Sequence, residues 1–246
     1  MFIGHPRSGH TLVGSLLNAH PEVVIAHELN ALRYLAKRLG PFSLSRDQLY
    51  AMILERDRWF QRRNAEWTGY AYAVSGQWQG RFETLRVIGD KKGGGTSRQL
   101  ELAPGLLEQL RLLIGVPLRL LLVVRNPFDN ITTMWRRNPH TTLDQQIECY
   151  FQLADSIQAT LRQCALEEIH TVSHEHFVTE PATELEAILK FIGVEPAVGY
   201  LNACTAIVRP APHFSRHEVD WPDTAVERVE RQIARYGFLD GYCFEE

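Results

Sequence analysis

Residues 2–11 read FIGHPRSGHT, and the expected architecture of the chain follows from this stretch. A short apolar segment runs through Pro-Arg-Ser-Gly-His-Thr into residues 12–17, where apolar side chains recur at helical spacing. This order of strand, glycine-containing loop and helix is typical of a phosphate-binding loop. The free N–H groups at the start of a helix, together with the helix dipole, attract anions. The sequence therefore predicts an anion site beside Gly9.

Apolar runs alternate with amphipathic stretches beyond this loop, which is typical of an α/β domain with a parallel sheet. Further strands are expected at 23–26, 85–89, 118–124 and 169–173, and helices at 31–64, 182–192 and 224–236. Residues 69–82, with aromatic side chains and three glycines, are expected to form a hairpin or an insertion over the sheet. We expect one domain over 1–246, with a P-loop-like three-layer α/β fold in which helices flank a central parallel sheet.

Composition narrows the class of protein. Hydrophobic residues make up 45 % of the 246 residues, enough for a substantial core, and the net charge of −3 does not favour nucleic acid as a partner. The four cysteines lie far apart without a C-x-x-C pair, which favours free thiols in a reducing compartment. No apolar run is long enough to span a membrane, and a cytoplasmic protein is expected.

Charged residues follow the expected strands, where ligands bind in an open α/β sheet. The strand ends carry His5–Thr11, His27–Glu28, Asp90–Lys92 and Arg125–Pro127. Three of these four strand ends carry a cationic side chain, and the remaining one carries the carboxylate of Glu28. Together they predict a site for an anionic ligand with a base beside it.

The opening loop departs from the nucleotide-binding loop G-x-x-x-x-G-K-[ST] at one position. The second glycine (Gly9) and the hydroxyl residue (Thr11) fit, but His10 stands where the lysine of ATP and GTP enzymes belongs, which argues against a kinase. Gly9 permits a close approach of the anion, Ser8 and Thr11 add hydroxyl groups, and Arg7 supplies a permanent forked charge.

Two segments carry a resemblance to a known family. PRSGHTLVGSLLNAHPEVVIAHE (6–28) resembles the 5′-phosphosulfate loop and following helix of sulfotransferases that use 3′-phosphoadenosine 5′-phosphosulfate (PAPS), nearest the tyrosylprotein and carbohydrate branch. VVRNPFDNITTMWRR (123–137) resembles the segment of that family that binds the 3′-phosphate. Thr133 falls at the family's spacing, eight residues after Arg125, and Arg137 follows one helical turn later. The resemblance implies that these three residues bind the 3′-phosphate.

Two further segments are less similar to the family. VSHEHFVTEPATELEAILKFIGVEP (172–196) has His174 where the family has a tyrosine beside adenine. VRPAPHFSRHEVDW (208–221) stands where related enzymes close a basic loop on the 3′-phosphate. Arg209 and Arg216 are the candidates there, and Arg216 is included among the expected donor contacts.

The resemblance implies in-line transfer of a sulfuryl group from PAPS to a hydroxyl or amine acceptor, releasing adenosine 3′,5′-bisphosphate (PAP) without a metal. Arg7 and Lys91 would stabilise the charge that develops, with Lys92 as a rival to Lys91. Glu28 would be the general base, because its spacing from Arg7 equals that of the catalytic glutamate in the tyrosylprotein branch. His27 and His10 are the alternative bases.

Two other functions stay open at this stage, a P-loop small-molecule kinase and a non-catalytic nucleotide-binding module. The acceptor is expected to be a small molecule, a carbohydrate or a peptide, with neither nucleic acid nor a membrane span involved. Residues 31–84 match no motif and are expected to form the acceptor side, as a helical and hairpin region. Their aromatic residues are expected to belong mainly to the core; they are Trp59, Trp67, Tyr70, Tyr72 and Trp78.

Overall fold

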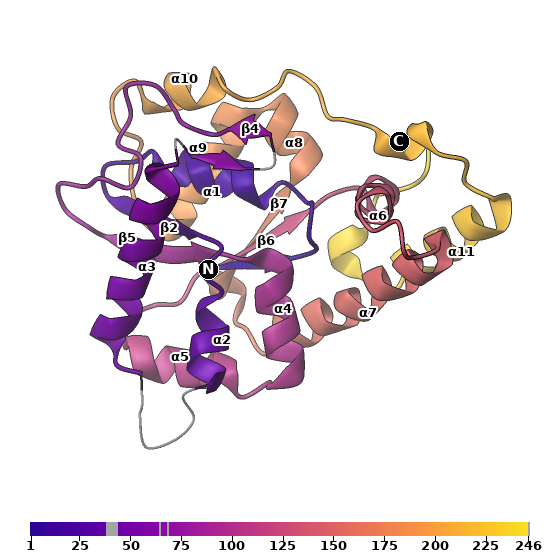
Figure 1. The fold of residues 1–246 in the computed structure, drawn as a ribbon, viewed down its shortest axis with the longest axis horizontal. Helices are drawn as coiled ribbons and strands as arrows, with labels where there is room; N and C mark the ends of the chain where they lie inside the picture. The colour runs from indigo at the N-terminus through magenta and orange to yellow at the C-terminus, as the bar shows by residue number, and fades with distance from the viewer. Residues whose placement is uncertain (38–43, 64, 68, 246) are drawn as a thin grey trace.

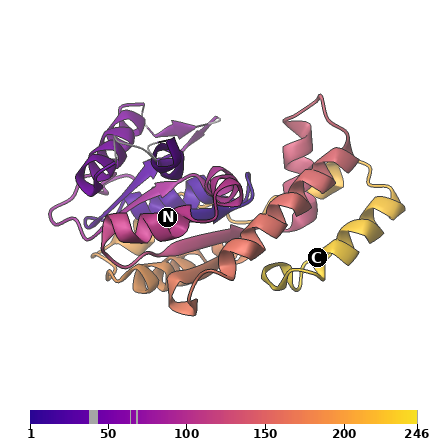
Figure 2. The same cartoon turned by 90° about the horizontal axis from the view of Figure 1, so that it is seen from below.

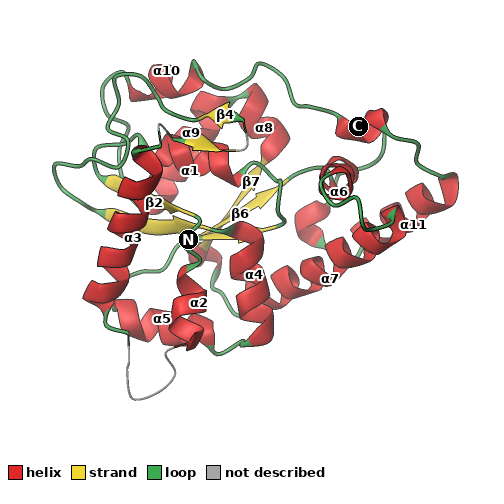
Figure 3. Cartoon of the chain, in the orientation of Figure 1, coloured by secondary structure: helices red, strands yellow, loops and turns green. Residues whose placement is uncertain are grey.

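The computed structural model describes residues 1–37, 44–63, 65–67 and 69–245 (Figure 1). Strands β1 (Phe2–Gly4), β6 (Leu120–Val124) and β7 (Ile169–Ser173) pair in the order β1-β6-β7, and both pairings are parallel. Strand β2 (Val23–His27) pairs in parallel with β5 (Val87–Lys91). A short antiparallel hairpin consists of β3 (Glu66–Trp67) and β4 (Tyr70–Ala71). In Figure 3 the parallel strands lie at the centre of the molecule, with helices around them.

The helices of the described residues connect and cover these strands (Figures 1 and 2). They are α1 (His10–Asn18), α2 (Ala31–Lys37), α3 (Arg46–Gln61), α4 (Gly93–Leu102), α5 (Leu106–Ile114), α6 (Pro127–Arg136), α7 (Leu143–Leu161), α8 (His174–Thr179), α9 (Pro181–Ile192), α10 (Tyr200–Thr205) and α11 (Asp223–Ile233). Short 3₁₀ helices occur at Leu166–Glu168, Ser215–Glu218 and Gly237–Leu239. In the part of the chain that the structure describes, no helix combines the length and the apolar character needed to cross a membrane.

Side chains of the buried strands point alternately into two hydrophobic cores, one on each face of the parallel strands. Ile3 of β1 and Leu122 of β6 belong to a core that helices α2, α3, α4, α5, α7 and α11 cover. Phe2 and Leu121 belong to the other core, with residues of α1, α9 and α10. Because successive side chains of a strand point to opposite faces, this division places the parallel strands between two helical layers. The expected three-layer α/β fold is confirmed.

The expected strand at 85–89 is shifted, since β5 runs to Lys91. The apolar run ends before Asp90, but Asp90 and Lys91 continue the ladder opposite Ala26 and His27. Asp90 remains in the strand because its carboxylate accepts bonds from the N–H groups of Leu29 and Ala31, at 2.9 and 2.8 Å. Lys91 therefore ends the strand rather than following it.

Two helix boundaries also differ from expectation. Residues 31–64 form α2 and α3 rather than one helix; residues 38–43 and 64 lie outside the described part. Helix α6 begins at Pro127 with Asn126 as its N-cap, whose Oδ1 accepts a 3.0 Å bond from the N–H of Phe128. From the sequence alone, Asp129 is the expected cap of a helix that begins near Asn130. Asp129 lies instead in the first turn and pairs with a distant arginine, described below.

Candidate functional site

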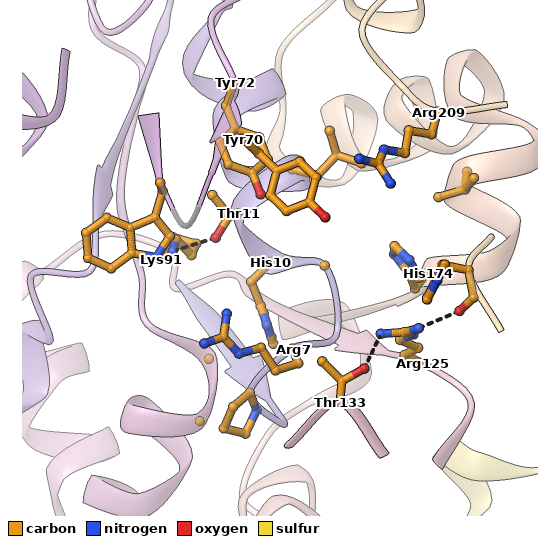
Figure 4. A pocket seen from close by; sticks show the side chains of 18 of the residues that line it. Arg7, His10, Thr11, Tyr70, Tyr72, Lys91, Arg125, Thr133, His174 and Arg209 are labelled. Atoms are coloured by element: carbon orange, nitrogen blue, oxygen red, sulfur yellow. Dashed lines mark hydrogen bonds between the residues drawn. The ribbon is translucent and has the colours of Figure 1, made fainter. Parts of the chain in front are cut away.

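A cavity of about 960 Å³ opens where the parallel strands end, between the start of α1, the β3–β4 hairpin and residues 207–215. Figure 4 shows side chains from all these segments facing it. Seven of the described lining residues are cations, and one is a carboxylate, Glu28. The cations are Arg7, Lys91, Lys92, Arg125, Arg136, Arg137 and Arg209. The cavity is therefore suited to a ligand with several negative charges.

The loop that precedes α1 is shaped for an anion. Gly9 is the N-cap of α1 and has φ 93°, a left-handed conformation that favours glycine. A Cβ atom at this position would lie 2.5 Å from Nδ1 of His174, so the glycine also makes room for that ring. Arg7, at φ 71°, and Thr11 line the cavity beside it. The Oγ of Ser8 is buried and accepts a 2.7 Å bond from Nδ2 of Asn130, so this side chain points away from the ligand space.

His10 lies underneath this loop. Its Nε2–H donates a 3.1 Å hydrogen bond to the carbonyl of Ile3, and its ring is edge-on to Phe2. A Cβ on Gly93 would come within 2.4 Å of the same ring. Burial, partly opposed by the Ile3 bond, lowers the pKa of His10 to about 4, so the ring is neutral at neutral pH. His10 therefore packs against the backbone of the loop. The lysine that ATP and GTP enzymes have at this position would instead extend toward the bound phosphates.

Glu28 and Lys91 form the charged centre of the cavity. Nζ of Lys91 donates to Oε1 of Glu28 at 3.1 Å and to Oγ1 of Thr11 at 3.0 Å, and Nζ of Lys92 donates to Oε2 of Glu28 at 2.7 Å. Burial would raise the pKa of Glu28, but the two lysines outweigh it and lower the pKa to about 2. Burial lowers the pKa of Lys91 to about 8, with Glu28 opposing the shift. Glu28 also has φ 56°, a strained conformation that is frequent at functional sites.

A second polar group lies at the end of β6. Nη1 of Arg125 donates to Oγ1 of Thr133 at 3.3 Å, and Nη2 donates to the carbonyl of His213 at 2.6 Å. Oγ of Ser215 lies 3.0 Å from Oγ1 of Thr133. Arg125 and Thr133, which the resemblance predicts to bind one phosphate, thus lie in direct contact (Figure 4), and Arg137 lines the same cavity. Ser215 was missed, because nothing in its local sequence indicates a partner 82 residues earlier.

The two arginines of the C-terminal segment lie in different places. The guanidinium of Arg216 is buried, with Nη1 2.6 Å from Oδ2 of Asp129, and does not belong to the described cavity lining. Its backbone N–H also donates to Oδ1 of Asp129. Arg209 does line the cavity and lies over the ring of Tyr70, 4.8 Å from its centroid. The position of Arg209 thus fits a ligand contact, whereas Arg216 fixes the loop onto α6.

The aromatic residues of the hairpin face the cavity, contrary to the expectation that they belong mainly to the core. Trp67, Tyr70 and Tyr72 line it, and Tyr70 is 43 % exposed. Trp59 of α3 is 39 % exposed and stacks with Arg56 and Arg63 instead of packing inside. The hairpin is only two residues long on each side, and of its aromatic residues Trp67 packs inward against the ring of His27, at a centroid distance of 4.7 Å. Of the described residues, no group of three or more His, Cys, Asp or Glu is arranged to hold a metal ion.

Similarity to solved structures agrees with this architecture. The sulfotransferase domain of the olefin synthase of Synechococcus PCC 7002 superposes with a TM-score of 0.57 at 17 % identity, over 94 % of this chain and 91 % of that domain. The sulfotransferase domain of the curacin biosynthetic pathway gives 0.54 at 14 % identity, over 96 % of both chains. The sulfotransferase STF9 of Mycobacterium avium gives 0.53 at 12 % identity, over 98 % of this chain and 76 % of that protein. At these identities the likeness concerns the fold.

No curated protein has significant sequence similarity to this chain. The model of the sulfotransferase family, however, matches residues 1–197, which contain the phosphate-binding loop, Glu28, Lys91 and the Arg125–Thr133 pair. This match extends over most of the chain and is sufficient to assign the family. The structural similarity alone, at such low identity, would not be. The chain belongs to the sulfotransferase family.

Proposed function

We propose that this sulfotransferase uses PAPS as its donor and transfers the sulfuryl group in line to a hydroxyl or amine acceptor, releasing PAP. One observation carries the proposal: the loop at Arg7–Thr11, the Glu28–Lys91 pair and the Arg125–Thr133 pair all line one cavity. Two separated anion sites, with a base beside the first, match a donor that carries a phosphosulfate and a second phosphate.

The donor would lie with its phosphosulfate on the N–H groups at the start of α1 and its 3′-phosphate on Arg125, Thr133 and Arg137. The helix start supplies unpaired donors and a favourable dipole for the first group. Arg125 supplies a charge-assisted bond for the second, which AMP could not use. Val178, Ile207 and Ala211 form an apolar part of the lining beside His174, where the adenine would fit. His174 would stack on that base.

Glu28 is the base that the geometry favours over the two histidines. Nε2 of His10 is committed to the carbonyl of Ile3, and the ring is buried. The ring of His27 is stacked on Phe60 at a centroid distance of 3.9 Å, and burial lowers the pKa of His27 to about 3. His27 is not among the described lining residues, and His10 lines the cavity with its Nε2 already bonded to a carbonyl, whereas the carboxylate of Glu28 lines the cavity with both oxygens on lysines. A carboxylate at this point can take the proton of an acceptor that approaches the sulfur.

In the transfer step, the acceptor oxygen or nitrogen attacks sulfur and loses its proton to Glu28. The bond between sulfur and the bridging oxygen breaks, and its electron pair leaves with the 5′-phosphate of PAP. Arg7 and Lys91 stabilise the negative charge that develops on this leaving group. As in phosphoryl transfer, most of the acceleration comes from positioning and charge stabilisation.

The acceptor side is formed by the hairpin aromatics and the cations near them. Trp67, Tyr70 and Tyr72 offer flat apolar faces to a small molecule, a carbohydrate or a peptide side chain. The proposal is tested by incubating the protein with PAPS labelled in its sulfate and a panel of phenols, sugars, alcohols, amines and tyrosine peptides. Transfer of label to an acceptor, with release of PAP, is expected without added metal. Failure to transfer label to any class, together with absence of PAP binding, would refute it.

A further inference from the structure

Two consecutive lysines bind opposite oxygens of one carboxylate. Nζ of Lys91 lies 3.1 Å from Oε1 of Glu28, and Nζ of Lys92 lies 2.7 Å from Oε2. Neighbouring side chains in a strand normally point to opposite faces. Here the strand ends at Lys91, and Lys92, with φ −139° and ψ 37°, is the N-cap residue of α4. The chain leaves the strand at this point, so both ammonium groups converge on Glu28.

Each lysine stem lies against a glycine. A Cβ on Gly14 of α1 would come within 3.0 Å of Cγ of Lys91. A Cβ on Gly95 of α4 would lie 2.7 Å from Cγ and 3.1 Å from Cε of Lys92. Any larger residue at position 95 would therefore displace the Lys92 side chain. The absence of a side chain at Gly95, in the first turn of α4, thus leaves the space that the Lys92 side chain occupies.

The two lysines differ in what else they contact. Lys91 is 3 % exposed and also donates to Thr11 in the phosphate-binding loop, so it lies beside the expected position of the sulfonate. Lys92 is 33 % exposed and holds the other oxygen of Glu28. A bound sulfonate would compete with Glu28 for Lys91, but its position beside Thr11 leaves the Lys92 contact in place.

We propose that Lys92 is a positioning residue for Glu28, an inference that rests on the proposed function. When the donor sulfonate draws Lys91 away from Oε1, Lys92 keeps its bond to Oε2 and holds the carboxylate in place. Oε1 is then free to accept the proton of the acceptor. Without Lys92, Glu28 would keep Lys91 as its partner or rotate freely, and either outcome slows the transfer.

The pH dependence of the reaction reports on this role. Glu28 faces Lys91 of β5, Lys92 at the start of α4, Arg7 of the loop, His10 of α1 and His27 of β2. Burial lowers the pKa of both histidines far enough that they are neutral near pH 7. The charges that act on Glu28 near this pH are therefore those of the three cations. Loss of Lys92 removes one cation and raises the pKa of Glu28. The acid limb of kcat/KM then moves to higher pH, since the base must be deprotonated to act.

The test compares Lys92→Met, Lys92→Arg and Gly95→Ala with the wild-type chain. Lys92→Met is expected to lower kcat by about tenfold or more, because lost orientation outweighs the modest gain in basicity. The affinity for PAP should change little. Lys92→Arg keeps the cation and should restore most of the rate and the wild-type acid limb. Gly95→Ala should lower kcat in the same direction with an equal or higher Tm, since alanine favours a helix.

Gly105→Ala is the matched control, because a Cβ there meets only the far end of Gln109, at 3.9 Å, and should leave kcat unchanged. A wild-type enzyme that transfers sulfate while Lys92→Met keeps its kcat, or loses kcat with an unmoved acid limb, would overturn the inference alone. A wild-type chain that binds no PAP and transfers no sulfate would overturn the proposed function as well. The two failures are therefore distinguishable.

Discussion

Ser8 and Asn130 are joined by a buried hydrogen bond, in which Nδ2 of Asn130 donates to Oγ of Ser8 at 2.7 Å. Ser8 belongs to the phosphate-binding loop, and Asn130 lies in the first turns of α6, five residues after Arg125. Both side chains are fully buried. The loop and helix α6, 122 residues apart in sequence, are thus joined by a buried contact. We expect this contact to help fix the distance between the two proposed phosphate sites.

Ser8→Ala should destabilise the protein by about 1–3 kcal/mol, because the buried amide of Asn130 loses its partner. Urea unfolding measures the change, with Ser75→Ala, in an exposed turn, as the control. PAP binding should weaken as well, since the loop is no longer tied to α6. A Ser8→Ala protein with wild-type stability and wild-type PAP affinity would show that the contact is unimportant.

Arg125→Ala should weaken PAP binding strongly and AMP binding little. Its guanidinium lies beside Thr133 at the proposed 3′-phosphate site, and a charge-assisted bond contributes roughly 1.5–3 kcal/mol. Isothermal titration should therefore give a PAP-to-AMP affinity ratio that falls by about ten- to a hundredfold. The ratio is insensitive to a general loss of stability, which affects both nucleotides.

Arg162→Ala, an exposed arginine after α7, is the control for Arg125 and should leave the ratio unchanged. For the wild-type chain, stabilisation by PAP should persist in EDTA, because the site is proposed to work without a metal. Equal thermal shifts from PAP and AMP in the wild type would contradict the assignment of Arg125.

Glu28→Gln should lower kcat by about 100- to 10,000-fold, the usual cost of losing a general base. Glutamine keeps the size and one acceptor oxygen but cannot take a proton. PAP affinity should survive or increase, because a negative charge near the anion disappears. Glu22→Gln, at the other end of β2 and paired with Arg86, is the matched control and should keep full activity. Near-normal turnover of Glu28→Gln on a hydroxyl acceptor would show that another residue is the general base.

The sequence predicted the sheet and the cavity wall around Gly9 and Arg125 more closely than the wall formed by the β3–β4 hairpin. Local patterns define the loop at Gly9 and the spacing of Arg125 and Thr133, and both segments lie where the strands end. The predicted bounds of β5 were wrong at its end, because polar residues do not indicate a strand until their hydrogen-bond partners are known. Asp90 and Lys91 pair with Ala26 and His27 in the ladder, and their side chains contact Leu29, Ala31 and Glu28, which are distant in sequence.

Long-range contacts account for the other differences. Nothing near Arg216 indicates that Asp129, 87 residues earlier, would bury its guanidinium, and the same holds for Ser215 beside Thr133. The aromatic residues of the hairpin looked like core residues because composition alone does not distinguish a core from an apolar cavity wall. One local signal was available, since three glycines directly after Lys92 indicate close packing around the start of a helix. Gly93 accommodates His10, and Gly95 accommodates Lys92.

His10→Thr, which replaces the ring by a small hydroxyl side chain, should affect stability more than activity. The histidine ring fills space between Gly4 and Gly93 and donates to the carbonyl of Ile3, and threonine can do neither. A loss of about 1–3 kcal/mol at pH 7.5 is expected from the void and the unpaired carbonyl. PAP binding should survive, because the backbone N–H at position 10 remains.

The stability difference between the wild type and His10→Thr should shrink as the pH falls. Burial lowers the pKa of His10 to about 4 in the folded state, against an ordinary value of 6.5, so between these values the unfolded state binds more protons. The wild-type chain thus has its full stability above pH 6.5 and loses about 2 kcal/mol from this residue by pH 5. The threonine variant lacks this loss, whereas His5, buried with its pKa lowered to about 3, is common to both chains and cancels. Urea unfolding at pH 7.5 and pH 5 measures the two differences. A difference that stays constant or grows on acidification would mean that His10 is protonated in the folded protein, and would return it to consideration as the base.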